Sequence, residues 1–375
     1  MAESPSPRRP TLDPASAAIR TAVRAGLAAA ASVAEPNPTE SRSAESNPTV
    51  PRPAVPNPAE SGSAESDPTV PGLIVAVSGG ADSMALLHAT AFLHRRGEVR
   101  ARAVTVDHGL QSGSTEVARR VVATAESWGM PAGRAPVDIT AGEEGVEAAA
   151  RTARYAALET ARRESCADWI LTAHTRSDQA ETVLLGLMRG SGTRSLAGMS
   201  PQTGRLLRPL LGLDRDQTEE SCRAQGIEVW NDPMNVDPAF TRVRARQLLA
   251  VLETELGQPL VANLARTADL CRADADYLDD RANAVVHGLR GAASVPVEAF
   301  TVLDDAVLGR VVRDWAISLG VPAQNFGGTR VSELCSLIRS RRRGRLSLPG
   351  DTEVVIDRGH VVFQVAAKAH ESRRQ

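Results

Sequence analysis

The chain has 375 residues, 42 % of them hydrophobic, and a formal net charge of −2. This is enough apolar material for two folded domains, and the charge alone neither favours nor excludes a nucleic-acid partner. Its four cysteines are far apart and form no Cys-x-x-Cys pair, which argues against a structural zinc site and a disulfide framework and fits a cytoplasmic protein. No stretch is apolar for long enough to span a membrane.

The first 71 residues are predicted to form one helix followed by a linker. Residues 12–33 have the spacing of an amphipathic helix, with Ile19, Val23 and Leu27 on one face. Residues 36–71 are rich in Pro, Ser and Glu, and they contain a segment that repeats with a period of 20. Because two polar, proline-rich copies cannot bury a core, we expect a disordered linker that is neutral for function.

A strand, a loop with two glycines and a helix follow this linker. Leu73–Val77 is an apolar run of strand length, and Met84–Arg95 carries Leu and Ala at helical spacing. The glycines let the backbone approach a phosphate at the helix N-terminus, and two serines add hydroxyl donors. Asp82 would repel that phosphate unless it holds a magnesium ion. The loop has no lysine, so it is not the loop of a P-loop NTPase.

This loop resembles the Ser-Gly-Gly-x-Asp-Ser loop of the ATP pyrophosphatase (PP-loop) family, whose members cleave ATP to AMP and pyrophosphate. The plain alternative is an ordinary glycine-rich turn, but six matching residues between a strand and a helix favour the family. The resemblance implies ATP and Mg²⁺ as cofactors, with Asp82 as the metal ligand. The residues predicted to bind the nucleotide are Ser78, Gly79, Gly80, Ala81, Asp82 and Ser83.

Strands and helices continue to alternate up to about residue 212, which predicts an α/β fold with a doubly wound parallel sheet. The expected strands are Val99–Val106, Ala135–Ile139 and Trp169–Thr172, and the expected helices are Thr115–Trp128, Gly145–Glu164 and Ser177–Arg189. In such sheets ligands bind beyond the carboxyl ends of the strands. The polar clusters obey this rule, because Ser78–Ser83, Asp107–His108 and His174–Asp178 each follow a strand end.

The pattern changes after residue 213. Residues 214–225 are predicted to be a linking helix, and long helical patterns cover 246–288, about 303–319 and 328–341. The end of the chain has short strands with turns at Pro349-Gly350 and Arg358-Gly359. We therefore expect residues 1–71 to lie outside a catalytic domain at 72–213, and residues 214–375 to form a mainly helical second domain that ends in a small β element.

A second motif follows the strand that begins at Trp169. Asp178 and Glu181 suit a helix N-terminus simply as caps. Yet Asp178-Gln-Ala-Glu-Thr182 and Arg189-Gly-Ser-Gly192 closely resemble a motif of the tRNA(Ile)-lysidine synthetase branch of the PP-loop family. Other segments that resemble this branch are Val106–Leu110, Glu147–Tyr155, Arg208–Leu211, Asn231–Arg246 and Leu348–Gly350. The pattern is broken at Gln111, Thr175 and Ser177, so no role is carried over to these three positions.

The resemblance implies a reaction on an isoleucine tRNA with a CAU anticodon. ATP adenylates O2 of the wobble cytidine and releases pyrophosphate, and the amine of free L-lysine then displaces AMP from C2.

Developing charge at the α-phosphate needs magnesium and fixed cations. The residues expected to take part in catalysis are Asp82, His108, Arg151, His174, Asp178 and Arg242. Of these, Arg151, His174 and Arg242 are candidate cations, as is Arg246. His108 is expected to position the nucleotide or substrate, and either Asp178 or Glu181 to hold or deprotonate the lysine ammonium.

Arginines are expected to bind the tRNA. Residues 330–345 contain six Arg against the single acidic residue Glu333. A charge run is more often a solvated face, but in a domain that by resemblance docks tRNA, phosphate contact is favoured. The residues expected to bind tRNA are Arg189, Arg246, Arg339, Arg341, Arg342, Arg343 and Arg345.

Two alternatives remain open at this point. One is another PP-loop tRNA-modifying ligase, although a thiolase should show paired cysteines and an amidotransferase a glutaminase nucleophile near the start. The other is a non-catalytic tRNA-binding protein on the same fold, which would have no use for Asp82. No partner protein is evident from the sequence, and a homodimer is left open.

Overall fold

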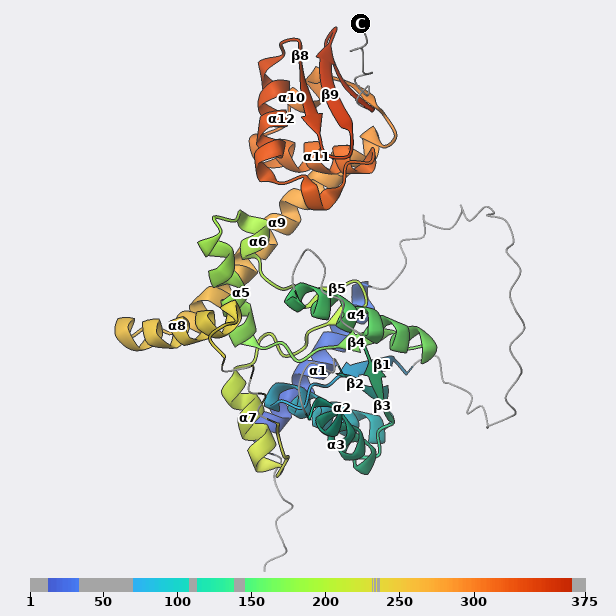
Figure 1. Cartoon of the computed structure of the whole chain (residues 1–375), viewed down its shortest axis with the longest axis vertical. Coiled ribbons are helices and arrows are strands. Elements are labelled where there is room, and N and C mark those ends of the chain that lie inside the picture. Colours follow the sequence, from blue (N-terminus) through green and yellow to red (C-terminus); the bar gives the residue numbers. More distant parts are fainter. Residues whose placement is uncertain are drawn as a thin grey trace, which may run out of the picture. The chain divides into compact units, whose positions relative to one another are not determined.

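The computed structural model describes residues 13–33, 70–107, 113–137, 146–230, 232, 234 and 237–365. They fall into two compact units (Figure 1). The first extends to Ala268 without residues 192–197, and the second contains residues 192–197 and the chain from Asp269 onward. The units therefore divide the chain at a different place from the expected boundary at residue 213. The functional division of the chain into those domains stays a prediction.

The first unit contains a six-stranded sheet with the order β3-β2-β1-β4-β6-β5. The strands are β1 (Gly72–Ala76), β2 (Arg100–Asp107), β3 (Ala132–Pro136), β4 (Trp169–Leu171), β5 (Gln202–Thr203) and β6 (Leu206–Leu207). All neighbouring pairs are parallel except β5 with β6. The predicted doubly wound α/β fold is confirmed, with a short antiparallel edge added.

The strand order reverses between β1 and β4. From β1 the chain moves outward through β2 to β3, and β4 then returns to the other side of β1. Ligands of such sheets bind outside the carboxyl ends of the strands at this switch point. The loop after β1 and the segment after β4 both begin here, so topology alone brings the two predicted motifs together.

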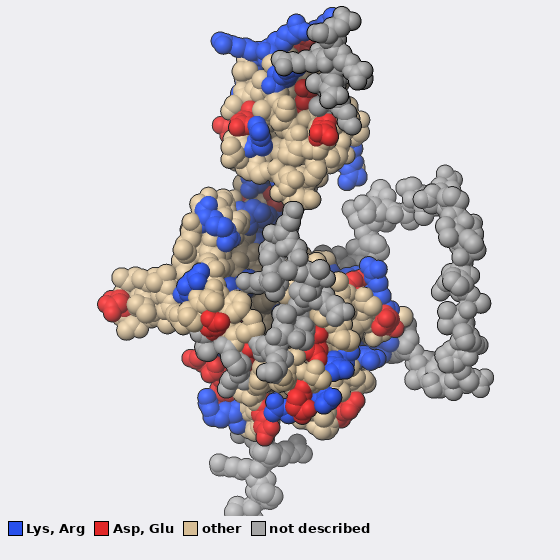
Figure 2. All heavy atoms as spheres, viewed as in Figure 1, with Lys and Arg blue, Asp and Glu red and all other residues tan. Residues whose placement is uncertain are grey.

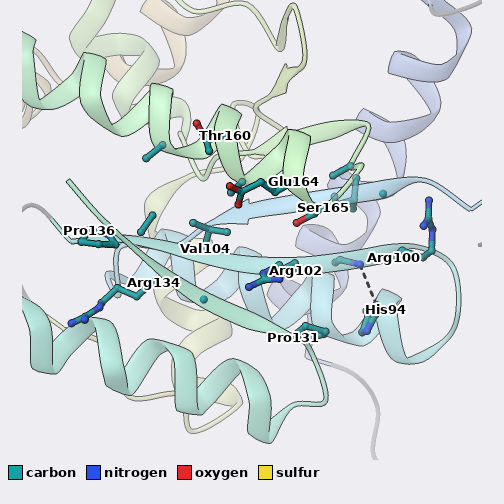
Figure 3. Close-up of a pocket in the computed structure, with 18 residues that line it drawn as sticks. His94, Arg100, Arg102, Val104, Pro131, Arg134, Pro136, Thr160, Glu164 and Ser165 are labelled. Atoms are coloured by element: carbon teal, nitrogen blue, oxygen red, sulfur yellow. Dashed lines mark hydrogen bonds between the residues drawn. The ribbon is translucent and has the colours of Figure 1, made fainter. Parts of the chain in front are cut away.

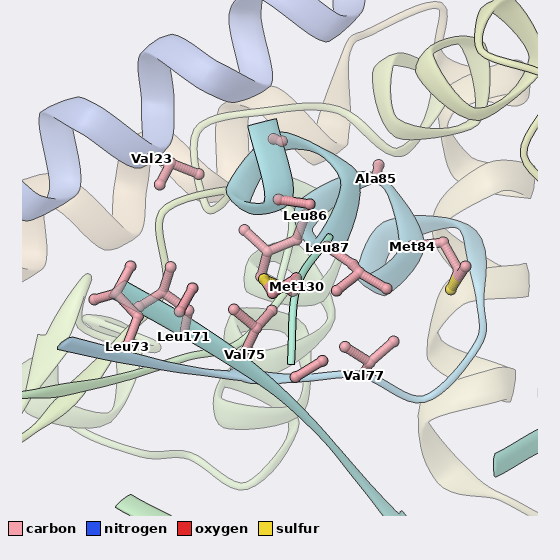
Figure 4. Close-up of a cluster of buried hydrophobic side chains, with 14 of the residues drawn as sticks. Val23, Leu73, Val75, Val77, Met84, Ala85, Leu86, Leu87, Met130 and Leu171 are labelled. Atoms are coloured by element: carbon pink, nitrogen blue, oxygen red, sulfur yellow. The ribbon is translucent and has the colours of Figure 1, made fainter. Parts of the chain in front are cut away.

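Alternating side chains of β1 pack into cores on opposite faces of the sheet. Leu73 and Val75 join a large cluster that also contains Val77 (Figure 4) and side chains of four helices. Ile74 packs with Leu158 on the other face. The helices of the larger cluster are α1 (Pro14–Val33), α2 (Ala81–Arg95), α3 (Ser114–Ser127) and α7 (Arg215–Ala224), and the opposite face carries α4 (Val146–Glu164). Helix α7 packs against both α1 and α2, so it is part of the first unit's core rather than a link between domains.

Helices α5 (Arg176–Met188) and α8 (Thr241–Leu256) pack together beyond the sheet. The helical pattern expected over 246–288 is two helices, because α8 ends at Gly257, whose φ of +61° terminates it, and α9 spans Leu260–Leu289. The predicted strand at Ala135–Ile139 is three residues too late. Its apolar alternation is weak, and the true β3 consists mostly of half-buried or exposed residues.

The second unit has its own core around Phe300, Trp315 and Phe326. It contains the part of α9 from Asp269 onward and the helices α6 (Thr193–Leu196), α10 (Val297–Thr301), α11 (Asp305–Ser318) and α12 (Gly328–Ser340), with a 3₁₀ turn η2 (Ala323–Asn325). An antiparallel sheet follows the order β7-β10-β9-β8, with β7 (Ser294–Pro296), β8 (Gly344–Leu348), β9 (Thr352–Asp357) and β10 (His360–Val365). The expected turn at Arg358-Gly359 is confirmed, with positive φ at both residues.

A cavity of about 800 Å³ lies on the α4 face of the sheet in the first unit (Figure 3). Arg100 and Arg102 of β2 and Glu164 of α4 line it, together with the beginnings of β1 and β3. None of the predicted site residues that the structure describes lines this cavity. It therefore belongs to the incompletely covered face of the sheet rather than to the switch point. Within the described ranges, no helix is long and apolar enough to cross a membrane.

Candidate active site

The loop between β1 and α2 closes around the hydroxyl of its last serine. Ser83 Oγ accepts hydrogen bonds from the backbone N–H groups of Ser78 at 3.2 Å and Gly79 at 3.1 Å, and it donates to Gly80 O at 2.9 Å. Gly79 has a φ of +92°, and a Cβ there would lie 3.1 Å from Val117 Cγ1. The loop thus directs two backbone donors to one oxygen at a helix N-terminus, the arrangement that binds a phosphate oxygen.

Asp82 is held from the neighbouring helix α7. Arg215 Nη2 lies 3.1 Å from Asp82 Oδ2, and the Thr218 hydroxyl donates to Asp82 Oδ1. The Asp82 side chain is 19 % exposed. Burial raises the pKa of this carboxyl group, whereas Arg215 and the Thr218 hydrogen bond lower it. Both carboxylate oxygens therefore have a partner in the free protein.

Three helix N-termini meet at this place through their charged side chains. Thr175 precedes α5, and both its N–H and its hydroxyl donate to Asp178 Oδ2, at 2.8 and 3.1 Å. Arg176 of α5 pairs with Asp214, the N-cap of α7, at 2.7 Å. Since Arg215 then joins α7 to α2, the positive dipole ends of α2, α5 and α7 are adjacent. Capping, the plain alternative for Asp178, is present, and it occupies one of the two carboxylate oxygens.

Glu181 is the most deeply buried acid of the site. Its side chain is 1 % exposed, and Oε1 lies 2.6 Å from Arg246 Nε of α8. Its other oxygen, Oε2, is buried without a hydrogen-bond partner. Burial raises the pKa of Glu181, and Arg246 lowers it. Arg246 also lies 3.9 Å from Asp178 Oδ1, so one arginine serves both acids of α5.

His174 follows β4 and is surrounded by arginines. Its Nδ1 lies 3.0 Å from the Thr172 hydroxyl. Burial and the charges of Arg208, Arg151 and Arg242 together lower the pKa of His174 to about 4, against the opposite effect of Asp178. At neutral pH the free protein therefore holds a neutral imidazole here, not the cation that the sequence suggests.

The remaining residues that the sequence predicts for the site lie in different environments. Arg151 of α4 is exposed, and its guanidinium carbon lies 5.1 Å from the centre of the Tyr155 ring. Arg242 of α8 is half-buried and acts on His174 through its charge. Arg189 is exposed at the end of α5. His108, Gln111 and the repeat within 36–71 lie outside the described residues, apart from Val70 and Pro71.

In the second unit, the predicted tRNA-binding arginines lie near the junction of α12 with β8. Arg339 is tied to its own unit, donating to Thr301 O and pairing with Asp305, each at 2.7 Å. Arg341 donates to the Thr301 hydroxyl, and Arg343 lies 3.4 Å from Asp357. The guanidinium groups of Arg342 and Arg345 have no described hydrogen-bond or ion-pair partner in this unit, and both side chains are exposed. Basic side chains gather on the surface over β8 and β9 (Figure 2).

The acids at the switch point suit a magnesium ion that is shared with a phosphate ligand. Across the described residues, no group of three His, Cys, Asp or Glu side chains could hold a metal by itself. Mg²⁺, however, commonly binds one or two carboxylates and completes its shell with phosphate oxygens and water. Asp82 provides such a carboxylate beside the β1–α2 loop, and Asp178 is near enough for its charge to raise the pKa of Asp82.

Sequence reasoning missed the contribution of α7. Arg215 and Thr218 contact Asp82 across more than 130 residues of sequence, and no local pattern marks a helix that packs back onto an earlier loop. It also missed Trp230, whose N–H donates to Gly79 O at 2.9 Å. The sequence shows only that Arg215 and Thr218 are one helical turn apart, so that both side chains lie on the same face of the predicted helix.

Comparison with known proteins bears directly on this site. The PP-loop domain family matches residues 60–252 of the chain. The chain is 44 % identical to tRNA(Ile)-lysidine synthase of Streptomyces coelicolor over 298 residues, which covers 78 % of this chain and 85 % of that protein. It is 47 % identical to the enzyme of the same name from Thermobifida fusca over 283 residues, covering 74 % and 87 %. The one from Leifsonia xyli subsp. xyli is 41 % identical over 349 residues, covering 91 % and 99 %.

Proposed function

The chain belongs to the tRNA(Ile)-lysidine synthase family, a family of ATP-dependent ligases with a PP-loop domain, and from this we propose how its own residues carry out the reaction. The substrates are an isoleucine tRNA with a CAU anticodon, ATP and L-lysine. The wobble cytidine is adenylated at O2 with release of pyrophosphate, and the amine of lysine displaces AMP from C2. Since these substrates are found in the cytoplasm, we propose that location for the enzyme.

The observation that carries the proposal is the meeting of three kinds of group at the switch point. Backbone donors of the β1–α2 loop converge on one acceptor oxygen, acids of α2 and α5 lie next to them, and arginines of α7 and α8 neutralise these acids. A polyphosphate, a metal ion and an ammonium group each find a partner of opposite charge in such a site. A purely RNA-binding protein has no need of buried acids.

We assign ATP to the loop and magnesium to Asp82. The N–H groups of Ser78 and Gly79 bind a phosphate oxygen in place of Ser83 Oγ. Asp82 would hold the ion, with Asp178 as the second carboxylate, and an ion there would supply positive charge to the phosphates. Arg151 and Arg242 are the cations near His174 that offset charge at the α-phosphate. We place His108 at the nucleotide or substrate, as the sequence suggests.

We assign the amine of lysine to the acids of α5. Glu181 has a buried oxygen with no partner, and its pKa is raised by burial. A carboxylate with a raised pKa is a better proton acceptor than an ordinary one. Glu181 therefore holds the ammonium group and takes its proton before the amine attacks C2, while Arg246 keeps the carboxylate in place. Asp178 keeps its capping role through Oδ2, and its other oxygen is left for the metal ion.

The test is AMP and pyrophosphate formation by the purified full-length protein. With ATP and lysine present, an isoleucine tRNA carrying CAU should be turned over, and a methionine tRNA with the same anticodon should not. Asp82→Asn, which keeps the size of the side chain, should reduce turnover by at least about 100-fold and leave tRNA binding intact. The proposal would be contradicted if AMP and pyrophosphate formed at the same rate without lysine. It would also be contradicted if the Asp82→Asn variant were as active as the wild type.

A further inference from the structure

Arg215 lies among the acids of the site, although it belongs to none of the sequence motifs discussed above. Its guanidinium lies 3.1 Å from Asp82 Oδ2. The charges of Asp82, Asp178 and Glu181 all raise its pKa, although its burial opposes them. It is the first residue of α7, so its backbone also stands at the positive end of that helix.

Arg215 and Thr218 contact different oxygens of the same carboxylate. Thr218 donates to Oδ1, and Arg215 pairs with Oδ2. If Arg215 leaves, the Thr218 hydrogen bond still orients the Asp82 side chain, and Oδ2 becomes accessible to another cation. The arginine is therefore the exchangeable partner, and the threonine is the fixed one.

The loop itself supplies little positive charge for a polyphosphate. It contains no basic residue, and the only lysine of the chain is Lys368, close to its C-terminus. Helix α7 is fixed beside the loop, because it packs on α2 and because Asp214 pairs with Arg176 of α5. The guanidinium of Arg215 is thus the cation that the fold holds against the loop's own acid.

We propose that Arg215 is a phosphate-binding residue for ATP. In the free protein it neutralises Asp82. With ATP and magnesium bound, Asp82 would hold the ion and the guanidinium of Arg215 would pair with the polyphosphate. No bond is formed or broken in this exchange, and the net charge of the site changes only by that of its ligands. The inference rests on the proposed function, because it takes ATP with magnesium as the ligand of the loop.

The experiment measures nucleotide binding by calorimetry, without tRNA or lysine, so its outcome does not depend on turnover. Arg215→Gln removes the charge and keeps a hydrogen-bond donor, and Arg215→Lys keeps the charge. Arg223→Gln is the matched control, because Arg223 is an exposed arginine at the other end of α7 that pairs with Glu220. Thr218→Val removes the other hydrogen bond to Asp82 without changing any charge. Each protein is titrated with ATP and with AMP in the presence of magnesium, and its unfolding temperature is recorded.

Arg215→Gln should weaken ATP binding by about tenfold or more and leave AMP binding unchanged, because AMP lacks the β- and γ-phosphates. Arg215→Lys should recover part of the loss, and Arg223→Gln should bind both nucleotides like the wild type. If Arg215 only ties α7 to α2, Arg215→Gln and Thr218→Val will weaken ATP and AMP alike, and that result overturns the inference. An ATP affinity of Arg215→Gln equal to that of the wild type also overturns it. In either case the wild-type protein still turns over tRNA if the proposed function is correct.

Discussion

The environment of Glu181 is one that its sequence position does not reveal. In the sequence it is one of two acids in the first two turns of a helix, where caps are common. In the structure the two acids differ, because Asp178 caps the helix through Oδ2 whereas Glu181 is buried against Arg246 with a free oxygen. An unpaired buried carboxylate oxygen is costly, and a ligand that donates to it would remove that cost.

Glu181→Gln should therefore impair the use of lysine more than the use of ATP. The amide keeps the shape of the side chain and one acceptor oxygen, but it loses the charge that attracts an ammonium group. We expect the KM for lysine to rise by about tenfold or more, measured as lysine-dependent AMP formation at saturating ATP and tRNA. The exposed Glu220→Gln is the control and should have no effect. A KM for lysine equal to that of the wild type would remove Glu181 from the lysine site.

At the residue scale, the sequence predicted the acids and cations but not their pairing. Asp82, His174 and Asp178 were found because they follow strand ends, and parallel topology brings strand ends together. The partners Arg215, Thr218 and Arg208 come from segments after β4, and no local rule says which side chain of a distant helix reaches an earlier loop. The protonation state of His174 was predicted wrongly for the same reason, because its burial depends on tertiary packing.

At the element scale, helix α1 contributes to the core of the nucleotide-binding unit. Ile19 and Val23 are fully buried in the same cluster as β1 and α2. The guanidinium carbon of Arg20 lies 3.6 Å from the centre of the Phe92 ring of α2. His88 of α2 packs edge-on against Trp128, with 5.0 Å between ring centres. Burial lowers the pKa of His88 to about 4, and the charges of Arg20 and Arg95 act in the same direction.

This packing predicts a loss of stability in mild acid. Because the pKa of His88 is lower in the folded than in the unfolded protein, the unfolded state binds more protons between about pH 6.5 and pH 4. Stability is therefore complete above pH 6.5 and falls as the pH drops through this window, by up to about 1.4 kcal/mol per pH unit for one such group. His88→Leu should flatten this dependence in urea unfolding curves recorded across the window.

His360→Leu is the matched control, because His360 is exposed on β10, and it should leave the pH dependence as in the wild type. A slope that is equally steep in His88→Leu would mean that His88 is accessible to water and that α1 does not cover it. His174 has a lowered pKa as well, so a part of the slope should remain in the His88 variant.

The predicted elements were most accurate where periodicity was strong. Helices α2, α3, α4, α5 and α7 begin or end within a few residues of the expected bounds. The errors fall on short or weakly patterned pieces, namely β3, the β5–β6 pair, α6, β7 and α10. Strands of two or three residues have no period to detect, and tertiary hydrogen bonding alone defines them. The expected linker stays a prediction, because residues 34–69 lie outside the described ranges.

At the scale of the whole molecule, the arginines of the two units differ in burial and in pairing. In the first unit the arginines of the site are partly buried and paired with acids, such as Arg215 with Asp82 and Arg246 with Glu181. In the second unit several arginines are exposed around the start of β8. Exposed arginines bind phosphates by releasing counterions, and that contribution weakens as salt rises. We therefore propose that the second unit holds the RNA backbone and that the first acts on one base.

This contrast yields a prediction within the arginine cluster itself. Arg342 and Arg345 are exposed on the second unit, whereas Arg339 is bound to the carbonyl of Thr301 and to Asp305. Replacing Arg342 and Arg345 together with Gln should weaken tRNA binding and lower the slope of log K against log salt by about 2, because each of the two arginines would neutralise one phosphate. Arg339→Gln should leave the slope unchanged, because its guanidinium already binds Thr301 and Asp305 within the unit.

Filter binding from 50 to 300 mM salt, roughly the range in which phosphate contacts dominate, would measure the slopes of both variants. Equal slopes in the double variant and the wild type would show that this cluster is a solvated face and that tRNA is held elsewhere.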